Sequence, residues 1–267
     1  DKDIDIVGAG KAVTRLLAQA DTGTADNDRA MILVNDGATL DLSDLEINGN
    51  NKLVFTGIAY NGSGVIDNVA FNEIKYNESG PHYAGIAVGV YGPTSDVDVS
   101  NSTFTEIGRI GLHYRGTVTG DFVDNTYTGK GAGDHLDYAL DISAGANILV
   151  EGNTISNNIG VADVDGSTSA GFLVTTFFAP GTTATVRDNT FTDNEADQFG
   201  GALYSELRDT LLIRRNLFCT NTANNEGGGM FVAPTNPGGD YQITNNLFVE
   251  NFAGSRGGGI ILVDVPN

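Results

Sequence analysis

One phrase is written three times near the end of the chain, between residues 189 and 262. Each copy fits the pattern F-x2-N-x-A-x3-G-G-[AG], followed by an apolar residue. The three phenylalanines are Phe191, Phe218 and Phe248, separated by 27 and 30 residues. Repeats of this length bury their apolar face only against neighbouring repeats, which is typical of a solenoid. The phrase therefore restricts the last third of the chain to a repeat architecture.

The register of the phrase can be followed upstream, counting from the asparagine two residues before each phenylalanine. This ladder position is occupied in turn by Leu45, Val69, Ser102, Asn125, Asn153, Asn189, Asn216 and Asn246. Two residues later stand Ile47, Phe71, Phe104, Tyr127, Ile155, Phe191, Phe218 and Phe248. Three residues earlier stand Leu42, Ile66, Val99, Phe122, Val150, Val186, Ile213 and Ile243. Both flanking positions are apolar or aromatic throughout, so we expect the repeat to run from about residue 39 to the end.

Short alternating segments, such as residues 183–186 and 240–243, predict strands, because an amphipathic helix needs apolar residues at three- and four-residue steps. We expect coils of about three strands, stacked about 4.8 Å apart as in any parallel ladder. Five successive asparagines at one corner predict a ladder of side-chain amides that bond between coils. The Gly-Gly pair of each phrase predicts a corner with positive φ or close backbone approach.

The three phrases resemble the repeats of bacterial polymorphic outer-membrane proteins. The whole chain is similar to the right-handed parallel β-helices of the pectate-lyase-like superfamily, and Ile4–Gly10 looks like an early coil of such a helix. A dinucleotide fingerprint is the competing interpretation of this segment, and it is weak, because the third glycine is absent and no βαβ unit follows. The resemblance implies an all-β, single-stranded right-handed parallel β-helix of about nine coils. Residues 1–267 would form one domain, a piece of a larger protein, since open solenoid ends expose strand edges.

Composition narrows the partners. The chain has 34 acidic and 14 basic residues and a net charge of −20. Such a surface repels phosphate backbones and anionic lipid, which argues against nucleic-acid partners and direct membrane insertion. The single cysteine, Cys219, excludes an internal disulfide, and we interpret it as a small buried core residue.

The richest polar cluster is expected in the middle coils. The strand 111–115 should turn Leu112 and Tyr114 inward and His113 and Arg115 outward. Asp141, in the next coil, would then lie on His113. The preceding loop adds Lys130, Asp134, His135 and Asp137.

The resemblance implies a chemistry for this cluster, proton abstraction beside a uronic carboxylate. His113, Lys130 or His135 would be the catalytic base, Arg115 the carboxylate clamp, and Asp141 an acid partner. Asp134 and Asp137 would be candidate calcium ligands. A hydrolase would instead use two of the aspartates as acid and base. The alternative is a solvated surface pair of His113 and Asp141, and we favour it because the enzyme family's catalytic signatures find no match.

Asp163 and Asp165 form a second candidate calcium loop, although the spacing fits neither an EF-hand nor a calcium β-roll. Acidic loop composition is the simpler interpretation. Calcium is therefore a candidate cofactor rather than a required one.

Three functions remain open from the sequence. The first is an extracellular or bacterial cell-surface structural module, adhesin-like, that contacts a polysaccharide or a surface protein. The second is a polysaccharide-active enzyme, a lyase, epimerase or hydrolase on an acidic polysaccharide, that uses the His113, Arg115 and Asp141 face. The third is a filament subunit that stacks end to end.

Overall fold

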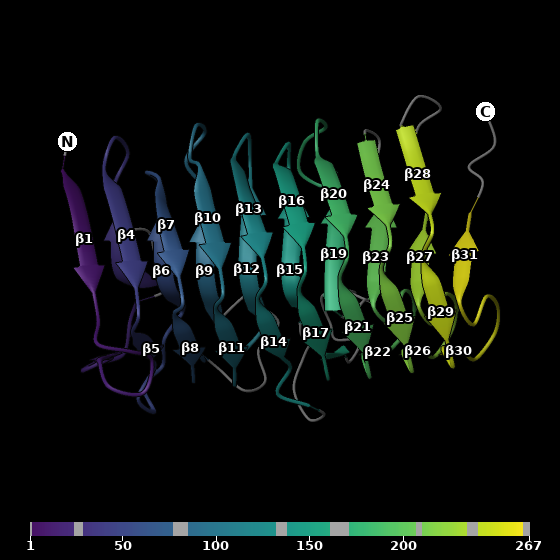
Figure 1. The fold of residues 1–267 in the computed structure, drawn as a ribbon, viewed down its shortest axis with the longest axis horizontal. Helices are drawn as coiled ribbons and strands as arrows, with labels where there is room; N and C mark the ends of the chain where they lie inside the picture. Colours follow the sequence, from purple (N-terminus) through teal and green to yellow (C-terminus); the bar gives the residue numbers. More distant parts are fainter. Residues whose placement is uncertain are drawn as a thin grey trace.

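The chain winds into a stack of short strands, seen side by side along the long axis in Figure 1. In the computed structural model, the described residues are 2–23, 29–76, 85–131, 138–160, 171–206, 210–233 and 240–263. Three sheets of nine strands run through the stack, and a fourth sheet of four strands joins its C-terminal part. Each coil contributes one strand to each long sheet, so the prediction of about nine coils is confirmed.

We call the long sheets A, B and C and the short one D. Sheet A contains β1 (Asp3–Val7), β4 (Thr39–Ser43), β7 (Gly64–Asp67), β10 (Val97–Ser100), β13 (Thr119–Val123), β16 (Asn147–Glu151), β20 (Thr183–Arg187), β24 (Thr210–Arg214) and β28 (Asp240–Thr244). Sheet B contains β2 (Arg15–Leu17), β5 (Glu46–Asn48), β8 (Ala70–Asn72), β11 (Thr103–Thr105), β14 (Thr126–Thr128), β17 (Thr154–Ser156), β21 (Thr190–Thr192), β25 (Leu217–Cys219) and β29 (Leu247–Val249).

Sheet C contains β3 (Ala30–Val34), β6 (Thr56–Tyr60), β9 (Ile86–Val90), β12 (Ile110–Arg115), β15 (Tyr138–Ser143), β19 (Gly171–Thr175), β23 (Leu203–Glu206), β27 (Met230–Val232) and β31 (Ile260–Leu262). Sheet D contains β18 (Ile159–Gly160), β22 (Glu195–Ala196), β26 (Thr222–Ala223) and β30 (Phe252–Ala253). The described strands pair in parallel, as the solenoid prediction requires.

The predicted register is confirmed at both flanking positions. In sheet A, Leu42 lies beside Ile66 and the pairing continues to Ile243. In sheet B, Ile47 lies beside Phe71 and the pairing continues to Phe248. These columns fill the interior, where successive rings stack at about 4.9 Å, as between Phe191 and Phe218. Parallel in-register stacking thus turns a sequence repeat into a continuous core.

The asparagine ladder is confirmed at the corner between sheets A and B. The backbone N–H of Asn153 donates to Asn189 Oδ1 at 2.9 Å, and the side-chain amide of Asn189 donates to Asn216 Oδ1 at 2.9 Å. Asn189 is 1% exposed, so these bonds satisfy groups that water cannot reach. A second ladder was missed by the sequence reasoning. It contains Asn158, Asn194, Asn221 and Asn251, at the corner after sheet B.

The Gly-Gly corners adopt the predicted conformations. Gly200, Gly227 and Gly257 have φ between 61° and 69°, a region that favours glycine. At the second glycine of the pair, a Cβ on Gly228 would lie 2.1 Å from the carbonyl oxygen of Phe252. Only glycine fits such a close approach.

The interpretation of Cys219 as a buried core residue is wrong. It is half-buried, in the outward position of β25, because Phe218 beside it points inward and neighbouring residues of a strand alternate. No helix in the described part of the chain is long and apolar enough to cross a membrane.

Candidate functional site

The middle strands of sheet C place the predicted polar residues together. Leu112 and Tyr114 in β12 are fully buried in the central core, as predicted. His113 pairs with Asp141 of β15, so the predicted stacking is confirmed. The alternation of β12 turns His113 away from the interior, onto the outer side of the sheet.

That outer side is not a solvated surface, and the prediction of a solvated pair is wrong. His113 is 6% exposed and Asp141 is 4% exposed. The outer side of sheet C carries an apolar cluster of its own, which includes Leu173, Tyr204 and Phe231, in register with Asp141 on the following strands. An outward direction on this sheet therefore leads into a second buried layer rather than into water.

The pair is close but not tightly bonded. His113 Nε2 lies 3.6 Å from Asp141 Oδ2, beyond the usual length of a hydrogen bond. On the other side of the imidazole, Tyr91 Oη lies 3.5 Å from Nδ1, and the two rings meet edge to face at 5.4 Å. Within the described residues, His113 Nε2 and Asp141 Oδ1 have no hydrogen-bond partner. The cluster therefore contains buried hydrogen-bonding groups that are not satisfied by the described residues.

Burial sets the protonation of the pair. It lowers the pKa of His113, an effect that the Asp141 carboxylate partly offsets and the Arg115 cation reinforces. Burial raises the pKa of Asp141, which the neighbouring His113, Arg115 and Arg109 pull back down. Burial also raises the pKa of Tyr91. Each shift disfavours a charge that water cannot solvate.

Arg115 ends β12 and is exposed. Its guanidinium lies 3.9 Å from the ring centroid of Phe178, in the segment between β19 and β20. Phe177 and Phe178 are 64% and 54% exposed. This cation–π contact joins a positive charge and two aromatic rings on the surface beside the buried pair.

Of the remaining predicted residues, the structure describes only Lys130. The ammonium of Lys130 donates to the carbonyl of Gly108 at 2.6 Å. Five residues lie outside the described part of the chain: Asp134, His135, Asp137, Asp163 and Asp165. Their roles as base or calcium ligands stay predictions. Among the residues that are described, no group of three or more His, Cys, Asp or Glu side chains could hold a metal ion.

Comparison with known families decides the classification. The family described as the right-handed β-helix region matches residues 30–265, most of the chain. The chain belongs to the right-handed β-helix family. No curated protein and no solved structure matches it. The narrower resemblance to polymorphic outer-membrane proteins stays a prediction.

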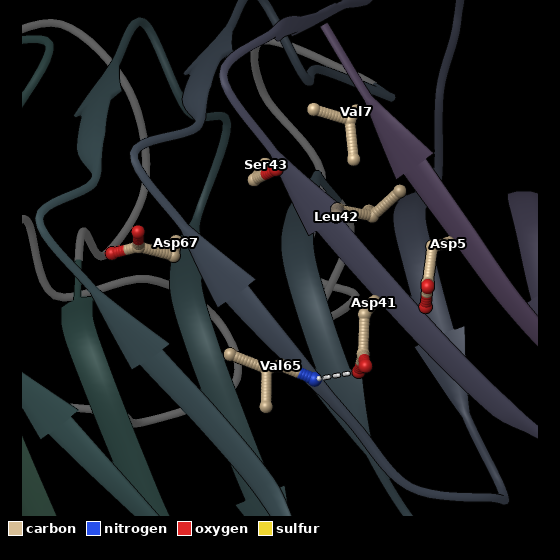
Figure 2. A pocket seen from close by; sticks show the side chains of 7 residues that line it. All are labelled: Asp5, Val7, Asp41, Leu42, Ser43, Val65 and Asp67. Carbon is tan, nitrogen blue, oxygen red and sulfur yellow. Dashed lines mark hydrogen bonds between the residues drawn. The ribbon is translucent and has the colours of Figure 1, made fainter.

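A depression lies elsewhere among the described residues, on the outer face of sheet A. It measures about 300 Å³, with Asp5, Asp41 and Asp67 along its lining. Figure 2 shows these carboxylates on neighbouring strands, with Asp41 Oδ1 accepting a hydrogen bond from the backbone N–H of Val65 at 2.8 Å. Hydrogen bonds from Asn101 and Ser100 lower the pKa of Asp67.

The acidic face of the β-helix extends along sheet A to Asp98 and Asp121, and the sequence reasoning missed it. The backbone N–H of Asp121 donates to Asp98 Oδ1 at 2.9 Å. Partial burial raises the pKa of both carboxyls, and their proximity raises that of Asp121 further. The available signal was the alternation Asp3-Ile-Asp5 and Asp96-Val-Asp98, which puts carboxylates on one side of two strands of the same sheet.

Proposed function

We propose that this β-helix is an extracellular or cell-surface structural module, adhesin-like, with no catalysis of its own. The observation that carries the proposal is the burial of the one predicted base–acid pair that is brought together within the described residues. A general base must come within hydrogen-bond reach of the proton it abstracts. His113 and Asp141 are both less than 7% exposed, and neither lines either of two depressions formed by described residues, at Asp41 and at Asn61.

The same cluster has a structural role that fits such a module. Tyr91, His113 and Asp141 lie on successive coils, so their contacts join three layers of the stack. A rigid rod that presents side chains at fixed intervals suits adhesion, because its binding surface is ordered before the partner arrives. The exposed Phe177, Phe178 and Arg115 support a polysaccharide or a surface protein as partner, since exposed aromatic and Arg side chains are typical binding anchors.

Product release tests the absence of catalysis. The purified chain is incubated with pectin, alginate and glycosaminoglycans, with and without added calcium, and both unsaturated uronic products and reducing ends are measured. We expect neither to rise above the level of heat-denatured protein. Reproducible product formation by the purified chain would overturn the proposal.

One observation favours the enzyme as a second candidate. Buried polar atoms without partners, here His113 Nε2 and Asp141 Oδ1, are uncommon in folded proteins, and a catalytic role is one explanation for them. An enzyme that uses this face would lose its activity in His113→Ala and Arg115→Ala, while Thr185→Ala on sheet A would keep it. Activity that survives both substitutions would remove this face as the active site.

Partner binding is tested separately on glycan arrays and bacterial surface extracts. We expect binding that falls in the double substitution Phe177→Ser and Phe178→Ser but not in Thr185→Ala. Equal binding by both variants would place the adhesive surface elsewhere on the rod.

A further inference from the structure

The outer face of sheet B carries hydroxyl groups at every outward position of four successive strands, β11, β14, β17 and β21. The first column of this hydroxyl array is Thr103, Thr126, Thr154 and Thr190. The second column is Thr105, Thr128, Ser156 and Thr192. Thr105, Thr126 and Thr154 are exposed and the other members are half-buried, so the array lies on the surface.

Strand geometry fixes the spacing of the array. Paired residues on neighbouring parallel strands are about 4.8 Å apart, and residues two apart on one strand are about 6.6 Å apart. The residue between each pair of hydroxyls points inward and is fully buried, as with Tyr127 and Phe191. The asparagine ladders fix the corners on both sides of strands β17 and β21. The platform is therefore rigid and regular before any ligand arrives.

The hydroxyls of the first column are not used by the protein. Within the described residues, Thr103, Thr126, Thr154 and Thr190 make no side-chain hydrogen bond. A threonine in a strand has a restricted χ1, so the methyl and hydroxyl groups hold fixed directions. The array thus presents alternating apolar and hydrogen-bonding points at regular intervals.

The array is also neutral, on a chain with a net charge of −20. Neighbouring strands of sheet A carry Asp98 and Asp121 on their outer face, whereas both columns of the array contain only threonine and one serine. Ionic partners need charge, and sugar rings need aromatic platforms or pockets. Neither is present in the array. A flat, neutral and periodic surface fits a partner that is itself flat, neutral and periodic.

We propose that the hydroxyl array binds ice. In hexagonal ice, the oxygen atoms repeat along a basal axis at nearly the separation of parallel strands. Along the hexagonal axis they repeat at an interval slightly longer than the separation of two outward residues on one strand. Water ordered around the methyl groups and bonded to the hydroxyls joins this lattice without rearrangement of the protein, so no conformational entropy is lost on binding.

The test measures ice affinity and thermal hysteresis of the full chain. The wild-type protein is expected to enter a growing ice hemisphere and to shape ice crystals. In the double substitution Thr126→Lys and Thr154→Lys, two long charged side chains stand in the centre of the array. We expect the ice-bound fraction to fall by about tenfold or more, because they hold the surface away from the lattice.

A matched control and a gain of function complete the experiment. Thr185→Lys places the same side chain on sheet A and should leave ice binding unchanged. Ser156→Thr completes the array and should raise thermal hysteresis. Circular dichroism and the melting temperature of each variant confirm that the fold is kept.

Three results would overturn the proposal. They are absence of ice binding in the wild-type protein, full activity in the double lysine variant, and binding to insoluble cellulose or chitin without binding to ice. Each of them leaves the proposed absence of catalysis intact, because the glycan-degradation assays measure it separately.

Discussion

The corner between sheets A and B is built in two ways in the same molecule. In the C-terminal coils it holds the amides of Asn125, Asn153, Asn189, Asn216 and Asn246. In earlier coils it holds Leu45 and Val69, both 0% exposed. Ser102 stands between the two kinds, since its backbone N–H donates to Asn125 Oδ1 at 2.8 Å and its Oγ accepts from the N–H of Val69 at 3.0 Å.

The difference teaches that the corner needs a buried side chain but not a particular chemistry. An aliphatic side chain adds to the apolar core, whereas an amide is stable there because the backbone and the amides of neighbouring coils supply its hydrogen-bond partners. Asn189, for example, also donates to the carbonyl of Val150 at 3.0 Å. The amide corner is therefore cooperative along the stack, and the aliphatic corner is local.

The largest effect is expected from breaking the amide corner in the middle. Asn189→Leu removes the acceptor of the Asn153 backbone N–H and a donor to Val150, both in a buried corner. Unpaired buried polar groups cost about 1–3 kcal/mol each, so we expect a loss of about 4 kcal/mol in the free energy of unfolding. Urea denaturation followed by circular dichroism measures it. A loss below about 1 kcal/mol would show that water replaces the ladder at this corner.

The reverse exchange, from an aliphatic side chain to an amide, should lower the free energy of unfolding by a smaller amount. Leu45→Asn removes a buried aliphatic side chain and gives the new amide no side-chain acceptor at Val69, the next corner along the stack. We expect a loss of about 3 kcal/mol by the same denaturation assay. Leu45→Met is the matched control and should stay within about 1.5 kcal/mol of wild type, because it conserves volume. Equal stability of the asparagine variant would contradict the local character of the aliphatic corner.

A smaller change in the free energy of unfolding is expected at the boundary between the aliphatic and the amide corners. Val69→Asn places an amide beside Ser102, whose hydroxyl already faces this position. The ladder would then extend by one coil, so we expect the free energy of unfolding to change by about 1 kcal/mol or less. A loss as large as that in Leu45→Asn would show that Ser102 cannot continue the ladder.

The smallest effect is expected from a change of pH, which alters the stability contributed by buried titratable groups but not that contributed by buried amides. Burial lowers the pKa of His113 in the folded protein. Its contribution to stability is therefore fully present above its unfolded pKa, about 6.5, and is lost as the pH falls through the folded value. His113→Gln should remove this slope between pH 7 and pH 5, whereas Asn189→Leu should keep it, because amides do not titrate. Denaturant midpoints at several pH values measure both, and an unchanged slope in His113→Gln would contradict the assignment.

The pH dependence of stability that Asp141 contributes has the opposite sign. Burial raises its pKa, so its contribution is present below the unfolded value, about 3.9, and is lost as the pH rises through the folded pKa. The contributions of His113 and Asp141 to stability should therefore be distinguishable when the free energy of unfolding is measured at several pH values. Asp141→Asn should remove the loss that begins above about pH 4, and it should enlarge the His113 slope, because the carboxylate that raises the His113 pKa is gone.

The sequence by itself determined the coil register. Phe191, Phe218 and Phe248 recur with their asparagines because every coil must match its neighbours, so the physical constraint is repeated along the chain and is readable there. The second ladder was readable in the same way, since Asn194, Asn221 and Asn251 belong to the repeated phrase. The hydroxyl array is also visible as Thr-x-Thr segments once the register is known.

The contacts around His113 and Arg115, outside the core, could not be read from the sequence. Alternation in β12 gives the direction of His113 but not its environment, which depends on Tyr91 and Asp141 in the neighbouring coils. The cation–π contact of Arg115 with Phe178 likewise joins segments 63 residues apart in the sequence. No repeated spacing in the sequence predicts it. Contacts that every coil repeats produce a repeated pattern in the sequence, so they can be predicted from it. Contacts that are made once, between side chains that the winding of the chain brings together, produce no such pattern.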